Sequence, residues 1–169
     1  ALQDALYDCD WLPFERFEDS VTKIKGNELR LHGERYRALV VPPTAGITAA
    51  TLEKVKRFFE AGGTVIGYGR LPERSLTLGK TAADIARLRE AIWGADARSG
   101  KSACRTSAKG GRSFFLAEQP SQAELAATLG EAGVPPVLRV LSGETGGWVH
   151  ALRRVDREGR AVLFIANQN

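Results

Sequence analysis

The stretch GADARSGKS at residues 94–102 combines glycines, a lysine and a serine in a way that suggests phosphate binding. A phosphate-binding loop needs Gly, four residues and then Gly-Lys-Ser/Thr, because its backbone N–H groups must curl around one phosphate. Gly94 and Gly100 are separated by five residues, which makes the loop one residue too long. The stretch also follows a helical pattern, whereas a phosphate-binding loop follows a buried strand. We therefore expect an exposed basic loop here and no nucleotide site.

The stretch GYGRLP at residues 67–72 has the glycine spacing of two other kinds of site. A nucleophile elbow places Ser or Cys between its flanking residues, whereas Gly67-Tyr68-Gly69 offers only a phenol. A dinucleotide-binding fingerprint needs a third glycine where this chain has Pro72. Neither pattern is complete, so no catalytic nucleophile and no cofactor are expected at this turn.

The two cysteines, Cys9 and Cys104, lie far apart in the sequence, and the chain has only two histidines. This spacing excludes a zinc ribbon, and we expect no metal site. A catalytic pair between a cysteine and His32 or His150 is left open, as is a disulfide between the two cysteines. Asp8 and Asp10 would share one face of a strand, at a separation that a glycosidase pair can use, but solvated acids at a strand end are the simpler interpretation.

Tyr68 and Arg70 are the candidate ligand-binding residues. Open α/β sheets bind ligands at the carboxyl ends of their parallel strands, and these two residues end the strand predicted at 64–69. A helix that begins near Thr48 would offer free N–H groups at the same edge. We therefore expect a shallow crevice that favours anions and lacks a nucleophile.

Composition places the chain among globular proteins. It has 169 residues, a formal net charge of +4 and 43% hydrophobic residues, which is enough for a real core. No apolar run is long enough to span a membrane, and no signal peptide opens the chain. A local basic excess has no aromatic residues to stack on bases, so no nucleic-acid partner is expected; it consists of Arg98, Lys101, Arg105, Lys109 and Arg112.

The elements that must position these residues alternate between strand and helix. YRALVVPP (36–43) predicts a strand buried on both faces, Thr48 caps a helix that ends at Gly62-Gly63, and TVIGYG (64–69) predicts a second buried strand. This order predicts a βαβ unit with parallel strands and a right-handed crossover.

The same pattern continues along the chain. Capping boxes at Thr81/Asp84 and Ser121/Glu124 predict two further helices, and RSFFLAE (112–118) predicts a third strand. YDCDWLP (7–13) predicts a strand, and residues 21–31 a hairpin that turns at Gly26-Asn27. Three more strands are expected in PPVLRVL (135–141), GGWVHALRRV (146–155) and RAVLFIAN (160–167).

The predicted fold class is therefore α/β. We expect a flavodoxin-like or class I amidotransferase-like parallel sheet with flanking helices, followed by antiparallel strands. Residues 1–134 would form the α/β domain, and residues 135–169 would begin a β domain or extend the sheet. The abrupt ends and the lack of any Met suggest a piece of a longer protein.

Three segments together resemble the alpha-L-rhamnosidases of glycoside hydrolase family 106. They are YDCDWLPFERFEDSVTKIKGNELRLHGERYRALVVPP, ITAATLEKVKRFFEAGGTVIGYGRLPERS and WVHALRRVDREGRAVLFIANQN, in the expected order. The chain departs from the family pattern at Leu163, where an aromatic residue is expected. The resemblance implies a multidomain sugar-cleaving enzyme whose catalytic carboxylates lie outside this segment. It transfers no catalytic residue to any position of this chain.

We therefore expect a non-catalytic accessory domain with a structural or inter-domain role in an alpha-L-rhamnosidase-like glycoside hydrolase. The alternative is a ligand-binding or degenerate amidotransferase-like module that uses the crevice at Tyr68 and Arg70. Other domains of the parent chain are the expected partners, with a second copy of the chain as an alternative. We expect a soluble protein without a membrane or nucleic-acid partner, and the parent's secretion and sugar specificity stay open.

Overall fold

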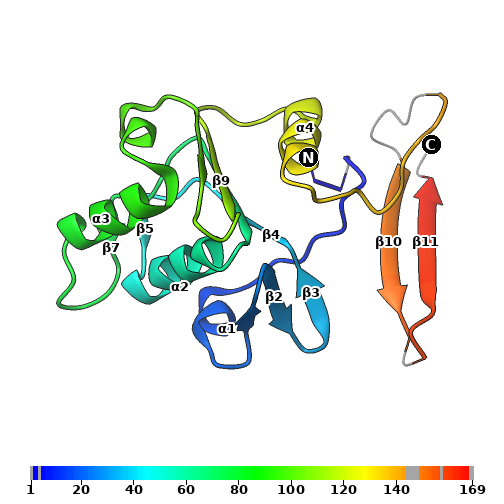
Figure 1. Ribbon diagram of the computed structural model, residues 1–169, viewed down its shortest axis with the longest axis horizontal. Coiled ribbons are helices and arrows are strands. Elements are labelled where there is room, and N and C mark those ends of the chain that lie inside the picture. The colour runs from blue at the N-terminus through cyan, green and yellow to red at the C-terminus, as the bar shows by residue number, and fades with distance from the viewer. Residues whose placement is uncertain (1, 4, 144–148, 157, 168–169) are drawn as a thin grey trace. The chain divides into compact units, whose positions relative to one another are not determined.

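The computed structural model divides into two compact units (Figure 1). The α/β unit comprises residues 12–119, and the second unit comprises residues 1–11 and 120–169. The structure describes residues 2–3, 5–143, 149–156 and 158–167, except for the side chain of Arg98. The predicted domain boundary after residue 134 stays a prediction.

The helices and strands of each unit follow one another along the chain. The α/β unit contains α1 (Phe14–Glu18), β1 (Lys23–Lys25), β2 (Glu28–Leu31), β3 (Glu34–Tyr36), β4 (Ala38–Val41), β5 (Gly46–Ile47), α2 (Ala49–Glu60), β6 (Thr64–Tyr68), β7 (Arg74–Ser75), α3 (Ala82–Trp93), the 3-10 helix η1 (Asp96–Ser99), β8 (Ala103–Thr106) and β9 (Arg112–Leu116). The second unit contains α4 (Gln122–Glu131), β10 (Val149–Val155) and β11 (Ala161–Asn167).

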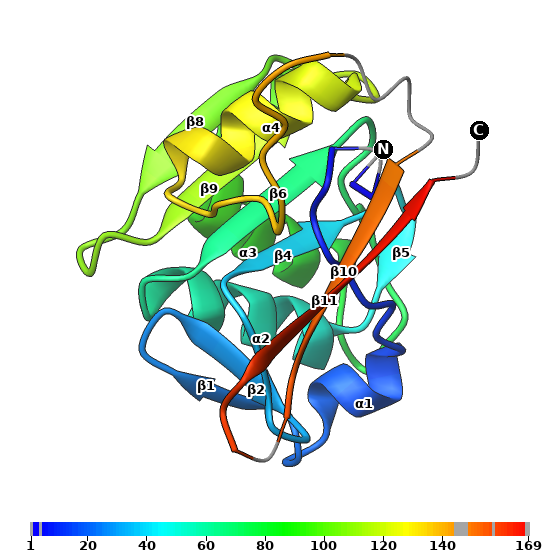
Figure 2. The same ribbon diagram turned by 90° about the vertical axis from the view of Figure 1, so that its right-hand side faces the viewer.

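The main sheet of the α/β unit is four-stranded, in the order β4-β6-β9-β8. β4, β6 and β9 are parallel, and β8 pairs antiparallel with β9 at the edge. Figure 2 shows these strands side by side, with α2 and α3 across one face. The predicted βαβ unit is confirmed. The predicted α/β class is confirmed, but the sheet is mixed, because β8, which was not among the predicted strands, pairs antiparallel with β9.

Side-chain caps begin the three long helices as predicted. The Thr48 Oγ1 accepts a hydrogen bond from the Thr51 N–H at 3.1 Å at the start of α2. Complete capping boxes, Thr81/Asp84 and Ser121/Glu124, begin α3 and α4. Each cap satisfies N–H groups that have no partner within the helix. Gly62 follows α2 with a φ of +110°, which L side chains rarely adopt.

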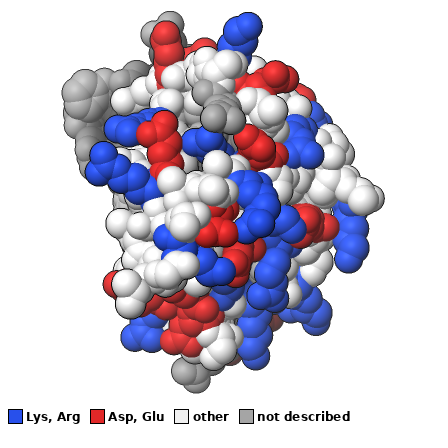
Figure 3. Space-filling model, turned by 90° about the vertical axis from the view of Figure 1, so that its left-hand side faces the viewer, with Lys and Arg blue, Asp and Glu red and all other residues white. Residues whose placement is uncertain are grey.

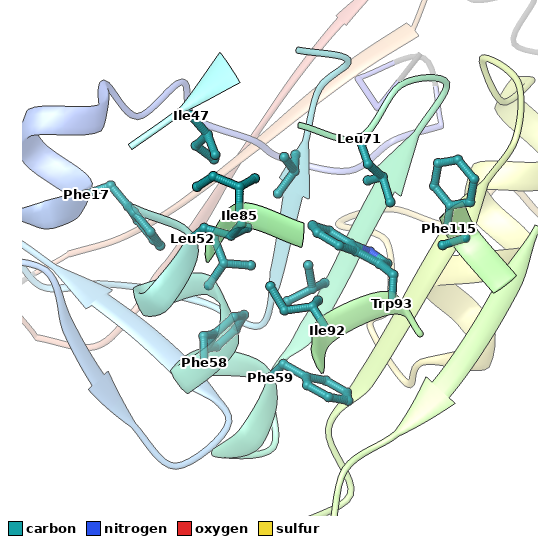
Figure 4. Close-up of a cluster of buried hydrophobic side chains, with 14 of the residues drawn as sticks. Phe17, Ile47, Leu52, Phe58, Phe59, Leu71, Ile85, Ile92, Trp93 and Phe115 are labelled. Carbon is teal, nitrogen blue, oxygen red and sulfur yellow. The ribbon is translucent and has the colours of Figure 1, made fainter. Parts of the chain in front are cut away.

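The core of the α/β unit lies between the sheet and the two helices α2 and α3. Leu52, Phe58, Ile85 and Ile92 point into it and are fully buried (Figure 4). The Trp93 side chain closes the cluster, and its Nε1–H donates to the Phe114 carbonyl at 3.0 Å. This bond satisfies the one polar atom of a ring that is otherwise surrounded by apolar groups.

The two strands of the βαβ unit differ in burial. Val65 and Ile66 of β6 are 0% exposed, whereas Ala38, Leu39 and Val40 of β4 are half-buried. The expectation that the 36–43 strand is buried on both faces is therefore wrong for most of its length. Among the strands that the structure describes, β4 has a neighbour on one side only, whereas β6 lies between β4 and β9.

Two predicted strands are absent from the described residues. Residues 7–13 and 135–141 have no ladder, although the backbone N–H of Val137 donates to the Leu6 carbonyl at 2.9 Å. Prolines explain much of this, because Pro135 and Pro136 have no N–H to donate. The hairpin at Gly26-Asn27 is confirmed as β1–β2 and gains a third strand, β3.

The second unit contains a two-stranded antiparallel ribbon, β10–β11, which confirms that the strands predicted at 146–155 and 160–167 are antiparallel. Asp156 holds its turn, since its Oδ1 accepts hydrogen bonds from the Glu158 and Arg160 N–H groups. Residues 146–148 of the predicted strand lie outside the described residues. None of the helices described is long and apolar enough to cross a membrane.

Candidate functional site

The carboxyl ends of the parallel strands are joined by backbone hydrogen bonds. The Gly69 N–H donates to the Leu116 carbonyl at 2.8 Å, which links the ends of β6 and β9. The Thr44 N–H donates to the Arg70 carbonyl at 3.2 Å, which links the segments that follow β4 and β6. The residues predicted to line a crevice are thus placed at this edge.

The turn after β6 lacks the geometry of a nucleophile elbow. A left-handed backbone occurs at Gly69, with a φ of +64°, and this residue has no side chain to present. Gly67 is also required by packing, because an added Cβ would lie 2.7 Å from the Leu71 Cδ2 and 3.1 Å from the Trp93 ring. That this turn carries no nucleophile stays an expectation from the sequence.

Tyr68 and Arg70 lie on either side of Gly69 in the sequence. Tyr68 is half-buried as the last residue of β6, and Arg70 is exposed. The Arg70 Nη2 lies 3.0 Å from the Glu73 Oε2, and both side chains are more than half exposed. An exposed pair of this kind adds about 1 kcal/mol or less to stability. That the two residues bind a ligand stays a prediction.

The amino end of α2 is occupied by the protein's own groups. The Ala49 N–H donates to the Thr77 Oγ1 at 2.9 Å, and the Thr51 N–H donates to the Thr48 Oγ1. The carboxylate of Glu18 also accepts hydrogen bonds from the hydroxyls of Thr48 and Thr51. The expectation of free N–H groups at this helix end is therefore wrong for Ala49 and Thr51.

The two hydroxyl donors at this helix end alter the acidity of Glu18. Hydrogen bonds from Thr48 and then Thr51 lower the pKa of Glu18, because both donors favour the ionised carboxylate. The nearby Lys54 acts in the same direction, and its Nζ donates to the Asp19 carbonyl at 2.7 Å. These contacts fix α1 against α2. The negative charge at the amino end of α2 is thus supplied by the protein's own Glu18 carboxylate.

One buried cation near the strand ends was missed by sequence reasoning. Arg89 of α3 is only 8% exposed, and its Nη1 donates to the Pro72 carbonyl at 3.3 Å. Its Nε is buried without a hydrogen-bond partner. The signal was present in the sequence, because Arg89 lies on the apolar face of α3 between Ile85 and Ile92. On the face that Figure 3 shows, Lys and Arg side chains are interspersed with Asp and Glu.

The other chemical candidates of the sequence do not assemble into a site. The 94–102 stretch connects α3 to β8, the reverse of the strand-to-helix order of a phosphate-binding loop. Cys9 and Cys104 are both free thiols. Among the described residues, no three His, Cys, Asp or Glu side chains gather to hold a metal ion.

Asp8 and Asp10 lie on an irregular segment, so the same-face geometry expected of a strand is wrong. The Asp8 Oδ2 instead lies 3.3 Å from the Arg154 Nη1, within the second unit.

Arg105, one residue of the basic excess noted in the sequence, has a structural role. Its Nη1 donates hydrogen bonds to the carbonyls of Glu90 and Ala91 and so caps the carboxyl end of α3.

A shallow pocket of about 240 Å³ lies at the opposite end of α2 from the strand ends. Two cations and one carboxylate, Arg57, Lys109 and Glu60, line it with Ile24 and Ala61. Glu60 is already paired with Lys56 at 2.6 Å. The pocket holds no group placed for acid–base or nucleophilic chemistry.

In the part of the chain that the structure describes, the fold is that of an α/β protein whose main sheet has three parallel strands and an antiparallel edge strand, with a β ribbon in the second unit. The model of the alpha-L-rhamnosidase family, glycoside hydrolase family 106, matches residues 3–169. The chain therefore belongs to this family, as the sequence resemblance implied. None of the curated proteins compared matches the chain.

Proposed function

We propose that this chain is a non-catalytic accessory domain of a multidomain alpha-L-rhamnosidase-like glycoside hydrolase, with a structural or inter-domain role. The family match supports the glycoside hydrolase origin. We further propose that the α/β unit derives from a flavodoxin-like or class I amidotransferase-like domain whose nucleophile position is lost. Gly69, which has the left-handed backbone after β6 but no side chain, supports that proposal.

The β10–β11 ribbon is the observation that carries the inter-domain role. Leu163 and Ile165 lie on one face of β11 and Val162 and Phe164 on the other, and each is 42–57% exposed. A two-stranded ribbon is marginal in water, and exposed apolar patches mark interaction sites. Further strands of the parent chain are therefore the partner that we propose for the ribbon, with residues 135–169 as the start of a β domain.

Three measurements test this function. The purified chain should not hydrolyse an aryl alpha-L-rhamnoside, because Asp8 and Asp10, the candidate carboxylate pair, lie on an irregular segment and Asp8 is paired with Arg154. In the longer enzyme that carries this segment, Tyr68→Phe and Arg70→Gln should each leave kcat/KM within a few fold. Phe164→Asp should lower the melting temperature of that enzyme, because it would place a charge in the proposed contact.

Two results would contradict the accessory role. Rhamnosidase activity that copurifies with the chain and is lost on Asp8→Asn would make this segment catalytic. Loss of turnover in Tyr68→Phe with an unchanged melting temperature would make the strand-end crevice an active site. Either result would replace the accessory role.

A further inference from the structure

The buried guanidinium of Arg89 has more donors than the protein uses. An arginine carries five N–H donors, and Arg89 uses Nη1 toward the Pro72 carbonyl. In the described part of the chain, its Nε has no partner and no bond is formed by Nη2. Buried charged groups in folded proteins are normally paired, so this arrangement calls for an anion.

The unused donors are adjacent and face the same way. Nε and Nη2 form the side of a guanidinium that holds one oxyanion with two hydrogen bonds. Arg30 shows this arrangement elsewhere in the chain, since its Nε and Nη2 donate to the Glu28 Oε2 at 3.1 and 2.8 Å. The Nε and Nη2 of Arg89 have no carboxylate partner of this kind among the described residues.

The loop around Arg89 is electropositive. The hydrogen bond and charge of Arg70 lower the pKa of Glu73, and the charges of Arg89 and Arg74 act in the same direction. Three guanidinium groups therefore act on the charge of one carboxylate, and that carboxylate is exposed and bonded to Arg70. The net charge of these four side chains, Arg70, Arg74, Arg89 and Glu73, is therefore positive.

We propose that Arg89 and the segment of residues 70–75, which ends in β7, form a binding site for a small oxyanion, a phosphate or carboxylate group, beyond the carboxyl end of β6. The oxyanion accepts hydrogen bonds from the Nε and Nη2 of Arg89, while Arg70 and Arg74 supply further positive charge. Nε is covered in the structure, and Leu71 and Pro72 beside it are buried, so this segment must shift to admit the anion. This site is independent of the accessory role proposed above.

Calorimetric titration of the 169-residue chain with inorganic phosphate, against chloride at equal ionic strength, tests the site. We expect saturable heat, and a melting temperature raised by about 4 °C at roughly ten times the dissociation constant. Arg89→Met should abolish both effects. Glu73→Gln should tighten binding several-fold, because it removes the carboxylate that competes for the same cations.

Arg87→Gln is the matched control, because Arg87 lies on the same helix but is exposed and paired with Asp84 at 2.7 Å. It should leave phosphate binding within twofold of the wild type. If Arg89→Met does not fold, Arg89→Lys should weaken binding at least tenfold, since lysine keeps the charge but lacks the paired donors.

Titration with acetate distinguishes the two ligand groups. Saturable acetate heat that requires Arg89 identifies a carboxylate site, and heat from phosphate alone identifies a phosphate site. No saturable heat with either anion would overturn the proposal. Equal binding by the wild type, Arg89→Met and Arg89→Lys would overturn it as well.

Discussion

At the scale of single residues, glycines decide how closely the core and the strand ends approach each other. Gly67 faces Leu71 and Trp93 across a space with no room for a methyl group. Gly130 in α4 has nothing within 4 Å of an added Cβ. The two positions therefore provide opposite tests of the same substitution.

Gly67→Ala should lower the free energy of unfolding by about 1–3 kcal/mol, because the new methyl group overpacks the core against the buried side chains of Leu71 and Trp93. Gly130→Ala should raise it by about 0.5–1 kcal/mol, because alanine loses less backbone entropy in a helix. Urea unfolding of both variants measures the difference. A neutral Gly67→Ala would show that the core is looser than this geometry requires.

Glu18 makes stability depend on pH in a definite direction. Its pKa is lower in the folded chain than the ordinary value of 4.5, so folding favours the ionised carboxylate. Its contribution is complete above the ordinary pKa and is lost as the pH falls through the folded value. Because Glu18 is exposed, we expect less than about 1 kcal/mol at neutral pH.

Glu18→Gln should therefore destabilise the chain at pH 7, and the difference from the wild type should shrink below about pH 4.5. Glu53→Gln, at an exposed position of α2, is the control. Urea midpoints measured from pH 3 to 7 test this prediction. A Glu18→Gln deficit that stays constant over that range would contradict it.

At the scale of elements, the order of the sheet determines which strand the fold depends on. β6 has a neighbour on each side and packs under α2 and α3, whereas β4 lies at an edge. Val65 is completely buried and Val40 is half-buried. A charge should therefore be much more costly on β6 than on β4.

Val65→Asp should lower the free energy of unfolding by about 4 kcal/mol or more, because it buries an unpaired carboxylate. Val40→Asp should cost clearly less, since its carboxylate can reach water. Circular dichroism melts of both variants, with expression levels compared, make the measurement. Equal losses would mean that β4 is as deeply enclosed as β6.

At the scale of the whole molecule, the two units differ in how completely they cover their apolar residues. The α/β unit has a closed core around Trp93. The β10–β11 ribbon leaves apolar side chains exposed on both faces, with Phe164 at 57% and Ile165 at 56%. Such a surface favours association, either with other segments or with itself.

The double variant Phe164→Ser/Ile165→Thr should change the free energy of unfolding by less than about 1 kcal/mol, because neither side chain is packed in a core. It should also reduce self-association in sedimentation velocity. Phe115→Ser, at a residue that is 2% exposed, should unfold the chain and is the contrasting control. A loss of several kcal/mol in the double variant would place the ribbon in a closed core.

Much of the fold could be predicted because its signals are local. The capping boxes at Thr81 and Ser121, the periodic apolar face of α2 and the hairpin turn at Gly26 each depend on residues a few positions apart. The family resemblance was also available from the sequence, and the family match confirms it. For the candidate site, the sequence placed Tyr68 and Arg70 at the end of β6 and excluded a nucleophile elbow.

The tertiary structure alone decided the features that depend on distant partners. Periodicity describes which face of a segment is apolar, but a strand exists only where another strand supplies its hydrogen bonds. This is why the sequence did not predict β8 beside β9, and why it wrongly predicted a strand at residues 7–13. For the same reason only the packed chain shows that Glu18 occupies the start of α2. It also shows that Arg89 donates a hydrogen bond to the Pro72 carbonyl, seventeen residues away in the sequence, while its buried Nε has no partner among the described residues.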